Sequence, residues 1–289
     1  MTPLPPPSLI PATRQRWWGA PAAANFALGG LGAGAYLVTV LAGRFAPSPG
    51  LALAAWLGPA LVVAGLAAVA TEAWRPLRGA RVLARARSSW MSRELWLGGG
   101  FVGLAALDAV RPSPAARGAA AACALAFVVA QGFILRRARG VAAWDVGVMP
   151  AVFLVSALVS GQGVLLLAGA VTGGAGAGAP LGATLVLVTA AMLVWLAYVT
   201  WSEDPTFVAA LAPLRDGVPG IVIVGGGLVT PFALAALALA FPASAPVPQG
   251  AAGACMIAGQ LYAKWLLVTR TGHLRPITAP TAALPGRLS

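Results

Sequence analysis

The sequence has 289 residues, of which 59% are hydrophobic and only 9% are charged, and its mean hydropathy is +0.85. Soluble domains carry roughly a quarter charged residues, so this composition excludes an ordinary soluble protein and indicates an integral membrane protein. A net charge of +12 could suggest a nucleic-acid partner. The arginines, however, lie in short stretches between apolar segments, where they govern membrane topology, and we expect no nucleic-acid binding.

Apolar runs of about 20 residues, long enough to cross a bilayer, recur along the whole chain. They are too long and too uniformly apolar for barrel strands, so they must be helices. We predict an all-α membrane protein, a single integral domain spanning residues 1–289, with about eight transmembrane helices in two four-helix bundles. The third predicted span is short and is expected to begin earlier, at Met91 or Ser92. The spans lie near Ala22–Ala42, Leu51–Thr71, Leu95–Val110, Ala115–Leu135, Val146–Ala170, Leu181–Thr200, Val218–Phe241 and Gly250–Thr269.

Charge predicts the orientation of these helices. An even number of spans places both termini, and the loops after the second, fourth and sixth spans, on one side. All Lys and Arg residues except Arg44, Arg111 and Arg117 fall on that side. By the positive-inside rule we expect a multi-pass protein of the bacterial cytoplasmic (inner) membrane, with tails 1–21 and 271–289 in the cytoplasm. Tryptophans near the same helix ends are typical of an interfacial belt contacting lipid. These are Trp17, Trp18, Trp74, Trp90, Trp96, Trp144, Trp201 and Trp265.

Few residues could hold a redox metal. The only histidine, His273, lies in the C-terminal tail, so we expect no membrane b-type haem and a solvated side chain. Cys123 and Cys255 lie singly inside apolar runs, so we expect no iron–sulfur cluster or structural zinc in this chain. Residues 1–21 are Pro-rich without an apolar core, and we expect no cleavable signal peptide. The run GGLGAG at 29–34 lies inside a predicted membrane helix, which favours close helix packing over phosphate binding.

The connector between Glu72 and Glu94 is the most distinctive segment, because two carboxylates flank a run of arginines at the membrane boundary. Carboxylates at membrane depth are costly and are functional-site candidates. Beside so many arginines they could equally be structural ion-pair partners. The sequence leaves both interpretations open.

The opening helix W-G-x-P-A-A-A-N-F-A-L-G-G-L-G-A-G and the connector E-x-x-R-P-L-R…S-S-W-M-S-R-E resemble the NrfD/PsrC/DmsC family. Its members are quinone-reactive membrane anchors of molybdenum or tungsten oxidoreductases. The resemblance covers the chain in helix number and spacing, but in motif only as far as the third span. It implies an anchor that exchanges electrons between an iron–sulfur partner and ubiquinone or menaquinone.

The resemblance also implies a site and partners. A quinone would lie at the cytoplasmic ends of the first three spans, bound by Asn25, Glu72, Arg75, Arg93 and Glu94. Asn25 would contact a ring carbonyl, Glu72 or Glu94 would exchange the proton, and the arginines would keep these acids ionised. A ferredoxin-like subunit and a molybdopterin catalytic subunit would dock on the cytoplasmic face, contacting the Arg75–Arg93 connector and the loop from Glu203 to Asp216.

Two other classes fit the same composition. A secondary transporter or ion-translocating protein is one, although we find no internal repeat of the kind typical of transporters. A structural assembly factor without a ligand is the other. The substrate of the catalytic partner, the direction of electron flow and the quinone type stay open.

The charge distribution leads to a topological prediction. A reporter that is active only in the cytoplasm should be active when fused after Ser289, because the arginine-rich loops should be retained on the cytoplasmic side. Activity restricted to the outside of the membrane would contradict this orientation.

Overall fold

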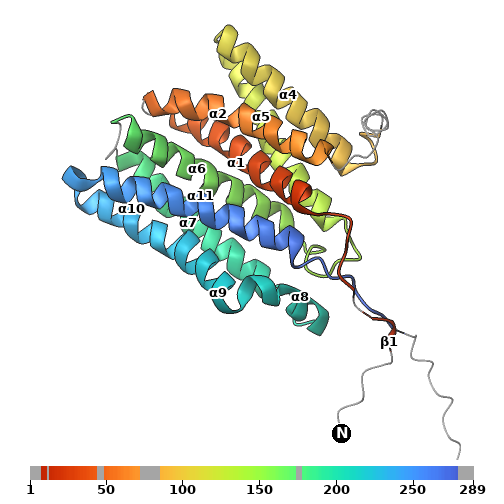
Figure 1. The fold of residues 1–289 in the computed structure, drawn as a ribbon. Coiled ribbons are helices and arrows are strands. Elements are labelled where there is room, and N and C mark those ends of the chain that lie inside the picture. Colours follow the sequence, from red (N-terminus) through yellow and green to blue (C-terminus); the bar gives the residue numbers. More distant parts are fainter. Residues whose placement is uncertain (1–7, 12, 44–48, 72–84, 174–177, 279–289) are drawn as a thin grey trace, which may run out of the picture.

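The computed structural model describes residues 8–11, 13–43, 49–71, 85–173 and 178–278, and most of these are helical. Figure 1 shows long helices packed side by side, with the start of α1 and the end of α11 at the same end. The long helices are α1 (Ala20–Ala42), α2 (Pro49–Ala70), α4 (Trp90–Val110), α5 (Pro114–Arg136), α6 (Met149–Val171), α7 (Gly178–Val199) and α11 (Pro246–Thr269). Between α7 and α11 lie α8 (Pro205–Arg215), α9 (Gly217–Gly220), the π-helical segment η1 (Ile221–Val229), α10 (Thr230–Ala240) and the short 3₁₀-helix η2 (Pro242–Ser244).

Within the described residues, seven helices are long and apolar enough to cross a membrane. They span Ala20–Ala42, Gly50–Ala70, Pro114–Arg136, Met149–Val171, Gly178–Val199, Gly217–Ala240 and Pro246–Thr269. Large apolar side chains cover their outer surfaces: Val186, Leu193 and Ile221 are 70%, 64% and 71% exposed. Such exposure suits contact with lipid chains. The chain is therefore a multi-pass membrane protein.

Helix α4 is absent from that set, although it has 21 residues. Arg93 and Glu94 in its first turns and Asp108 near its end lower its hydropathy. It begins at Trp90, because the side chain of Ser89 caps it by accepting a hydrogen bond from the Ser92 amide at 3.4 Å. The third predicted span thus does begin before Leu95.

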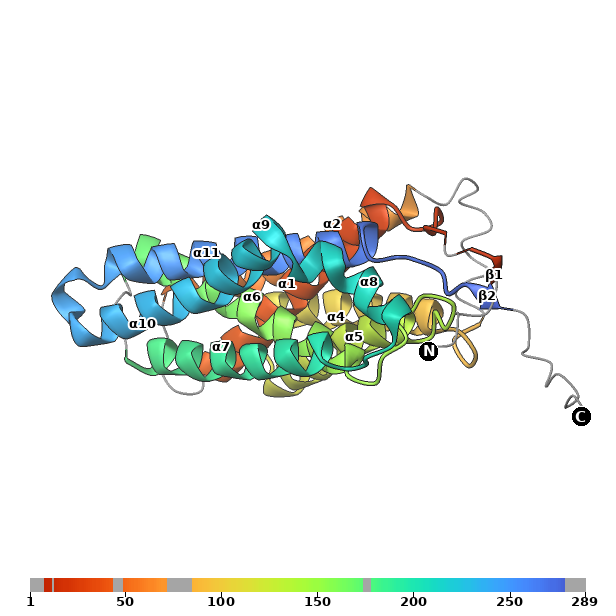
Figure 2. The same ribbon diagram turned by 90° about the horizontal axis from the view of Figure 1, so that it is seen from below.

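Both terminal segments lie at one end of the helices, which we call the basic end and define by Trp18, Arg93, Arg137 and Trp201. Figure 2 shows β1 (Ser8–Ile10) and β2 (Ile277–Thr278) there, where they pair antiparallel. The Gln15 amide donates to the Gly272 carbonyl at 2.7 Å, so the two terminal segments are joined. His273 is therefore half-buried, and the expectation of a solvated tail side chain was wrong for it.

Two predicted boundaries were also wrong. The fifth predicted span starts at Met149 rather than Val146, because the preceding residues form turns and Pro150 suits the first helical turn. The segment expected to be a loop from Glu203 to Asp216 contains α8. Asp204 caps this helix by accepting a hydrogen bond from the Thr206 amide at 3.0 Å. Its buried side chains are Phe207, Ala210, Leu211 and Leu214.

The glycines of α1 bring helix backbones together, as the sequence predicts. A Cβ atom on Gly34 would collide with the carbonyl of Ala157 on α6, and one on Gly32 with the carbonyl of Gly58 on α2. Small residues at such positions let membrane helices pack closely without a hydrophobic driving force. Helix α1 therefore packs between α2 and α6, and it also contacts α5 and α11.

The seventh span contains a feature that the sequence did not predict. Its middle third, η1, is π-helical, and a Cβ atom on Gly227 would lie 2.9 Å from the Cα atom of Gly259 on α11. A π-helical segment widens the helix locally and is frequent at functional sites. Here it brings η1 and α11 into backbone contact.

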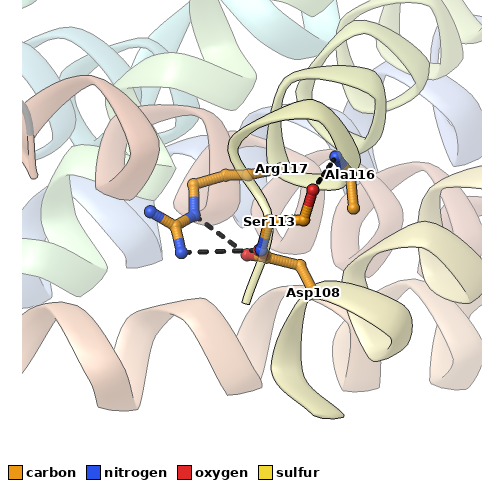
Figure 3. A network of polar contacts seen from close by, with 4 residues as sticks. All are labelled: Asp108, Ser113, Ala116 and Arg117. Carbon is orange, nitrogen blue, oxygen red and sulfur yellow. Dashed lines mark hydrogen bonds and ion pairs between the residues drawn. The ribbon is translucent and has the colours of Figure 1, made fainter. Parts of the chain in front are cut away.

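At the opposite end, an ion pair joins α4 to α5. Figure 3 shows the Asp108 carboxylate facing Arg117, with Nε of Arg117 2.9 Å from Oδ2. The Ser113 amide donates to Oδ1 of Asp108 at 2.9 Å, and the Ser113 hydroxyl caps α5 by accepting from the Ala116 amide at 3.4 Å. Since the Arg117 side chain is 49% exposed, this pair mainly orders the α4–α5 turn.

This packing predicts unequal effects of adding one methyl group to two glycines. Gly34→Ala should destabilise the detergent-purified protein by about 1–3 kcal/mol, because the methyl meets the α6 backbone. Gly99→Ala is the matched control, since a Cβ there meets nothing within 4 Å. It should leave the thermal midpoint unchanged or raise it, because alanine favours helix. Equal midpoints for both variants would contradict the close α1–α6 contact.

Candidate functional site

Three polar side chains converge inside the helices near the basic end. Helices α1 and α4 begin at this end and α5 finishes there, which brings Asn25, Glu94 and Gln131 to a common depth. Their exposed fractions are 2%, 5% and 0%. Burying polar or ionisable side chains within a membrane costs free energy, so such residues are candidates for a functional site. We call these residues the Glu94 cluster.

Hydrogen bonds hold the Glu94 carboxylate from two sides. Nδ2 of Asn25 donates to Oε1 of Glu94 at 2.8 Å, and Nε2 of Gln131 donates to the same oxygen at 3.0 Å. Nε2 of Gln131 also lies 3.4 Å from the backbone carbonyl of Asn25. Side-chain amides thus replace the water that a buried carboxylate loses, which is the condition for keeping it inside an apolar bundle.

Glycines make room for this cluster. A Cβ atom on Gly29 would lie 2.8 Å from Nε2 of Gln131, and one on Gly65 of α2 would lie 3.2 Å from the Asn25 carbonyl oxygen. The first glycine of the GGLGAG run therefore admits the Gln131 side chain. The second, Gly30, faces Lys264 on α11 instead.

Arg93 does not join the cluster, although it precedes Glu94. Its guanidinium donates to the carbonyls of Ala86 and Arg87 at 2.9 and 2.8 Å, and it stacks 4.3 Å from the Trp90 ring centroid. Within the described residues, Glu94 is held by amides rather than by an arginine. The other predicted site residues, Glu72 and Arg75, lie outside the described residues.

Two oxygens of the cluster have no hydrogen-bond partner. They are Oδ1 of Asn25 and Oε1 of Gln131, both buried. An unsatisfied buried acceptor costs about 1–3 kcal/mol, so this pair of oxygens suits a ligand that brings hydroxyl donors. A quinol carries two hydroxyl groups, and a quinone carries two carbonyls that amide N–H groups can bind. The donor and acceptor atoms of Asn25 and Gln131 therefore match the hydrogen-bonding groups of a quinone or quinol ring.

A cavity of about 520 Å³ opens at the basic end; Arg93, the residue before Glu94, lines it, but no residue of the Glu94 cluster does. Its size is within the range of small-molecule sites. Trp90 stacks on Phe133 with 4.4 Å between ring centroids, and Trp18 stacks on Trp144 at 5.2 Å. Lining residues include Trp18, Ser89, Trp90, Arg93, Ile134 and Arg137. Aromatic and basic groups thus line a cavity at the level of Arg93, one residue before Glu94.

The sequence missed two residues of this region. Gln131 was overlooked, although a glutamine inside an apolar span is a recognisable signal of a buried polar contact. Trp144 was assigned to the lipid-facing belt, which is wrong, because it is 2% exposed and its Nε1 donates to the Leu267 carbonyl at 3.0 Å. Trp17 and Trp96, at 86% and 58% exposed, do face outward.

Comparison with known proteins adds no family assignment. No protein-family model matches the chain, and no curated protein matches it. Within the described residues, no group of three or more His, Cys, Asp or Glu side chains is placed to hold a metal ion. The candidate site therefore rests on the geometry of the Glu94 cluster and on the motifs of α1 and the connector.

Proposed function

We propose that this chain is the quinone-reactive membrane anchor of a multi-subunit molybdenum or tungsten oxidoreductase. The observation that carries the proposal is the buried Glu94 carboxylate, held by the amides of Asn25 and Gln131, whose own oxygens lack donors. The cavity lined by Trp90 and Arg93 at the same end, and the resemblance to the NrfD/PsrC/DmsC family, support the same assignment.

A bound quinone supplies a two-electron, two-proton couple. The chain's part is to position the ring and to exchange protons with it. Asn25 and Gln131 present both N–H donors and carbonyl acceptors, so they can bind either redox form. Glu94 is the titratable group among the three, and it takes up or delivers the proton at its carboxylate oxygen. Glu72 remains a second candidate for this exchange.

The proposal includes an architecture. Helix α4 crosses the membrane as an eighth span, and the spans form two four-helix bundles that meet where α1 packs on α6. The basic end faces the cytoplasm of a bacterium and docks a ferredoxin-like iron–sulfur subunit, which connects to a molybdopterin catalytic subunit. Exposed groups at this end, including Trp17, Arg136 and Arg139, suit an acidic partner surface.

The site assignment predicts a selective loss of function. In the complex isolated from native membranes, Glu94→Gln should lower quinone-linked turnover about 100-fold or more, because the proton-exchanging group is gone. Activity with a soluble dye should persist, since the catalytic partner is untouched. Glu94→Asp should keep part of the turnover, because it retains a carboxylate. Glu72→Gln would show the same selective loss if Glu72 exchanged the proton instead.

The control is Asp108→Asn, which removes a carboxylate at the opposite end of α4 and should keep quinone-linked turnover. If Glu94→Gln and Glu72→Gln both assemble normally and keep full turnover at every pH, neither acid carries the proton and the assignment fails.

The docking face leads to a separate prediction. Charge reversal at Arg136 and Arg139 should reduce the iron–sulfur subunit that co-purifies with the tagged chain, because the attraction between the two surfaces is weakened. Arg111→Glu, at the opposite end, should leave recovery unchanged. The reverse pattern would place the partner on the other face.

One observation favours the transporter alternative. The seventh span is distorted by the π-helical segment η1, and Lys264 on α11 is buried within the helices; irregular helices and inward-facing charges are typical of transporters. The two functions can be separated with the purified chain in proteoliposomes. Solute or ion flux without any partner subunit or quinone would favour transport, and its absence together with the Glu94→Gln result would favour the anchor.

A further inference from the structure

Lys264 is the only lysine in the chain, and it lies inside the helices rather than at the surface. Its exposed fraction is 4%, and its Nζ atom lies 5.7 Å from the ring centroid of Phe153 on α6. Gly30 on α1 leaves the space for this ammonium group, because a Cβ atom there would collide with Nζ. An ammonium group at such a position needs a compensating negative charge or acceptor.

No described carboxylate supplies that charge. Glu94 forms no ion pair with Lys264; it accepts from Asn25 and Gln131, for which Gly29 rather than Gly30 provides the space. The remaining described acids have other partners or are exposed. Three form ion pairs: Asp108 with Arg117, Asp145 with Arg275, and Asp216 with Arg215. Asp204 caps α8, and Glu203 is exposed. Lys264 thus has no carboxylate partner within the described part of the chain.

A small cavity lies directly beside Lys264. Its volume is about 40 Å³, and Ser156, Gln260 and Lys264 are its polar wall together with the Tyr198 ring. The Ser156 hydroxyl is buried and has no hydrogen-bond partner, whereas the Tyr198 hydroxyl already donates to the Ala143 carbonyl at 2.9 Å. Since one water needs roughly 10–15 Å³, the space holds a monoatomic ion and a water but no quinone ring or lipid head group.

We propose that this cavity binds a single halide ion, chloride in the cell, through the Lys264 ammonium, the Ser156 hydroxyl and the Gln260 amide N–H groups. All three groups are hydrogen-bond donors, and together they match an anion that has no proton of its own. The ion neutralises the buried ammonium and links α6 to α11. This site is separate from the Glu94 cluster and does not depend on the proposed quinone reaction.

The test uses the full-length protein in detergent, with sodium chloride exchanged for sodium gluconate at constant ionic strength. The thermal midpoint should rise with chloride in a saturable way, because a ligand that binds only the folded state stabilises it. Bromide should replace chloride. Ser156→Ala should raise the half-saturating chloride concentration about tenfold, as expected for one lost hydrogen bond to a charged group.

Lys264→Met should abolish the chloride response, whereas Arg270→Met, which removes an exposed charge from the end of the same helix, should keep it. A midpoint that does not respond to chloride in the wild type, or a response that survives in Lys264→Met, overturns the proposal. So does a chloride response that appears only in Glu72→Gln, because that carboxylate would then neutralise Lys264 in the wild type.

A second measurement covers the case in which Lys264→Met does not fold. Protein labelled with ¹⁵N-lysine contains one side-chain nitrogen signal, because the chain has one lysine. Titration with chloride should shift this signal in the wild type, and the shift should need about tenfold more chloride in Ser156→Ala. A signal that stays constant across the titration contradicts halide binding at Lys264.

Discussion

A carboxylate buried among membrane helices is stable only if the protein replaces its lost water, and the arrangement around Glu94 follows from this constraint. Two amides supply the replacement, Asn25 from α1 and Gln131 from α5, at 2.8 and 3.0 Å from the same oxygen. Three helices must therefore meet at one depth. The three helices must pack directly against one another at this depth, without lipid between them. The hydrogen bonds of Glu94 thus fix the position of α4 and α5 relative to α1.

Helix α1 makes this possible because several of its positions have no side chain. Gly29 admits Gln131, Gly30 admits Lys264, and Gly34 touches the backbone of α6. Close backbone contact and room for polar groups thus come from the same run of glycines. Two consecutive glycines of one helix thus accommodate polar side chains from two different helices, Gln131 of α5 and Lys264 of α11.

Composition and periodicity were sufficient for the coarse fold, because a long apolar run has only one way to satisfy its backbone in lipid. The close packing through the glycine-rich helix also agreed with expectation, whereas the direct hydrogen bond between Asn25 and Glu94 was not predicted. Gln131 and Lys264 could not be assigned, since a lone polar residue in an apolar span does not reveal which helix it faces. The start of α6 and the existence of α8 depend on local turns and caps, and η1 has no distinct sequence pattern. Glu72 and Arg75 lie outside the described residues, and their predicted roles stay predictions.

The central claim is that Glu94 exchanges a proton with a quinone bound beside it. Infrared difference spectroscopy of the purified complex, recorded between the oxidised and reduced quinone pool, measures this directly through the carboxyl stretching band. The account predicts a carboxyl band that changes on reduction, disappears in Glu94→Gln and shifts in Glu94→Asp. A difference spectrum without a carboxyl change, or one whose carboxyl band is the same in Glu94→Gln, would contradict it.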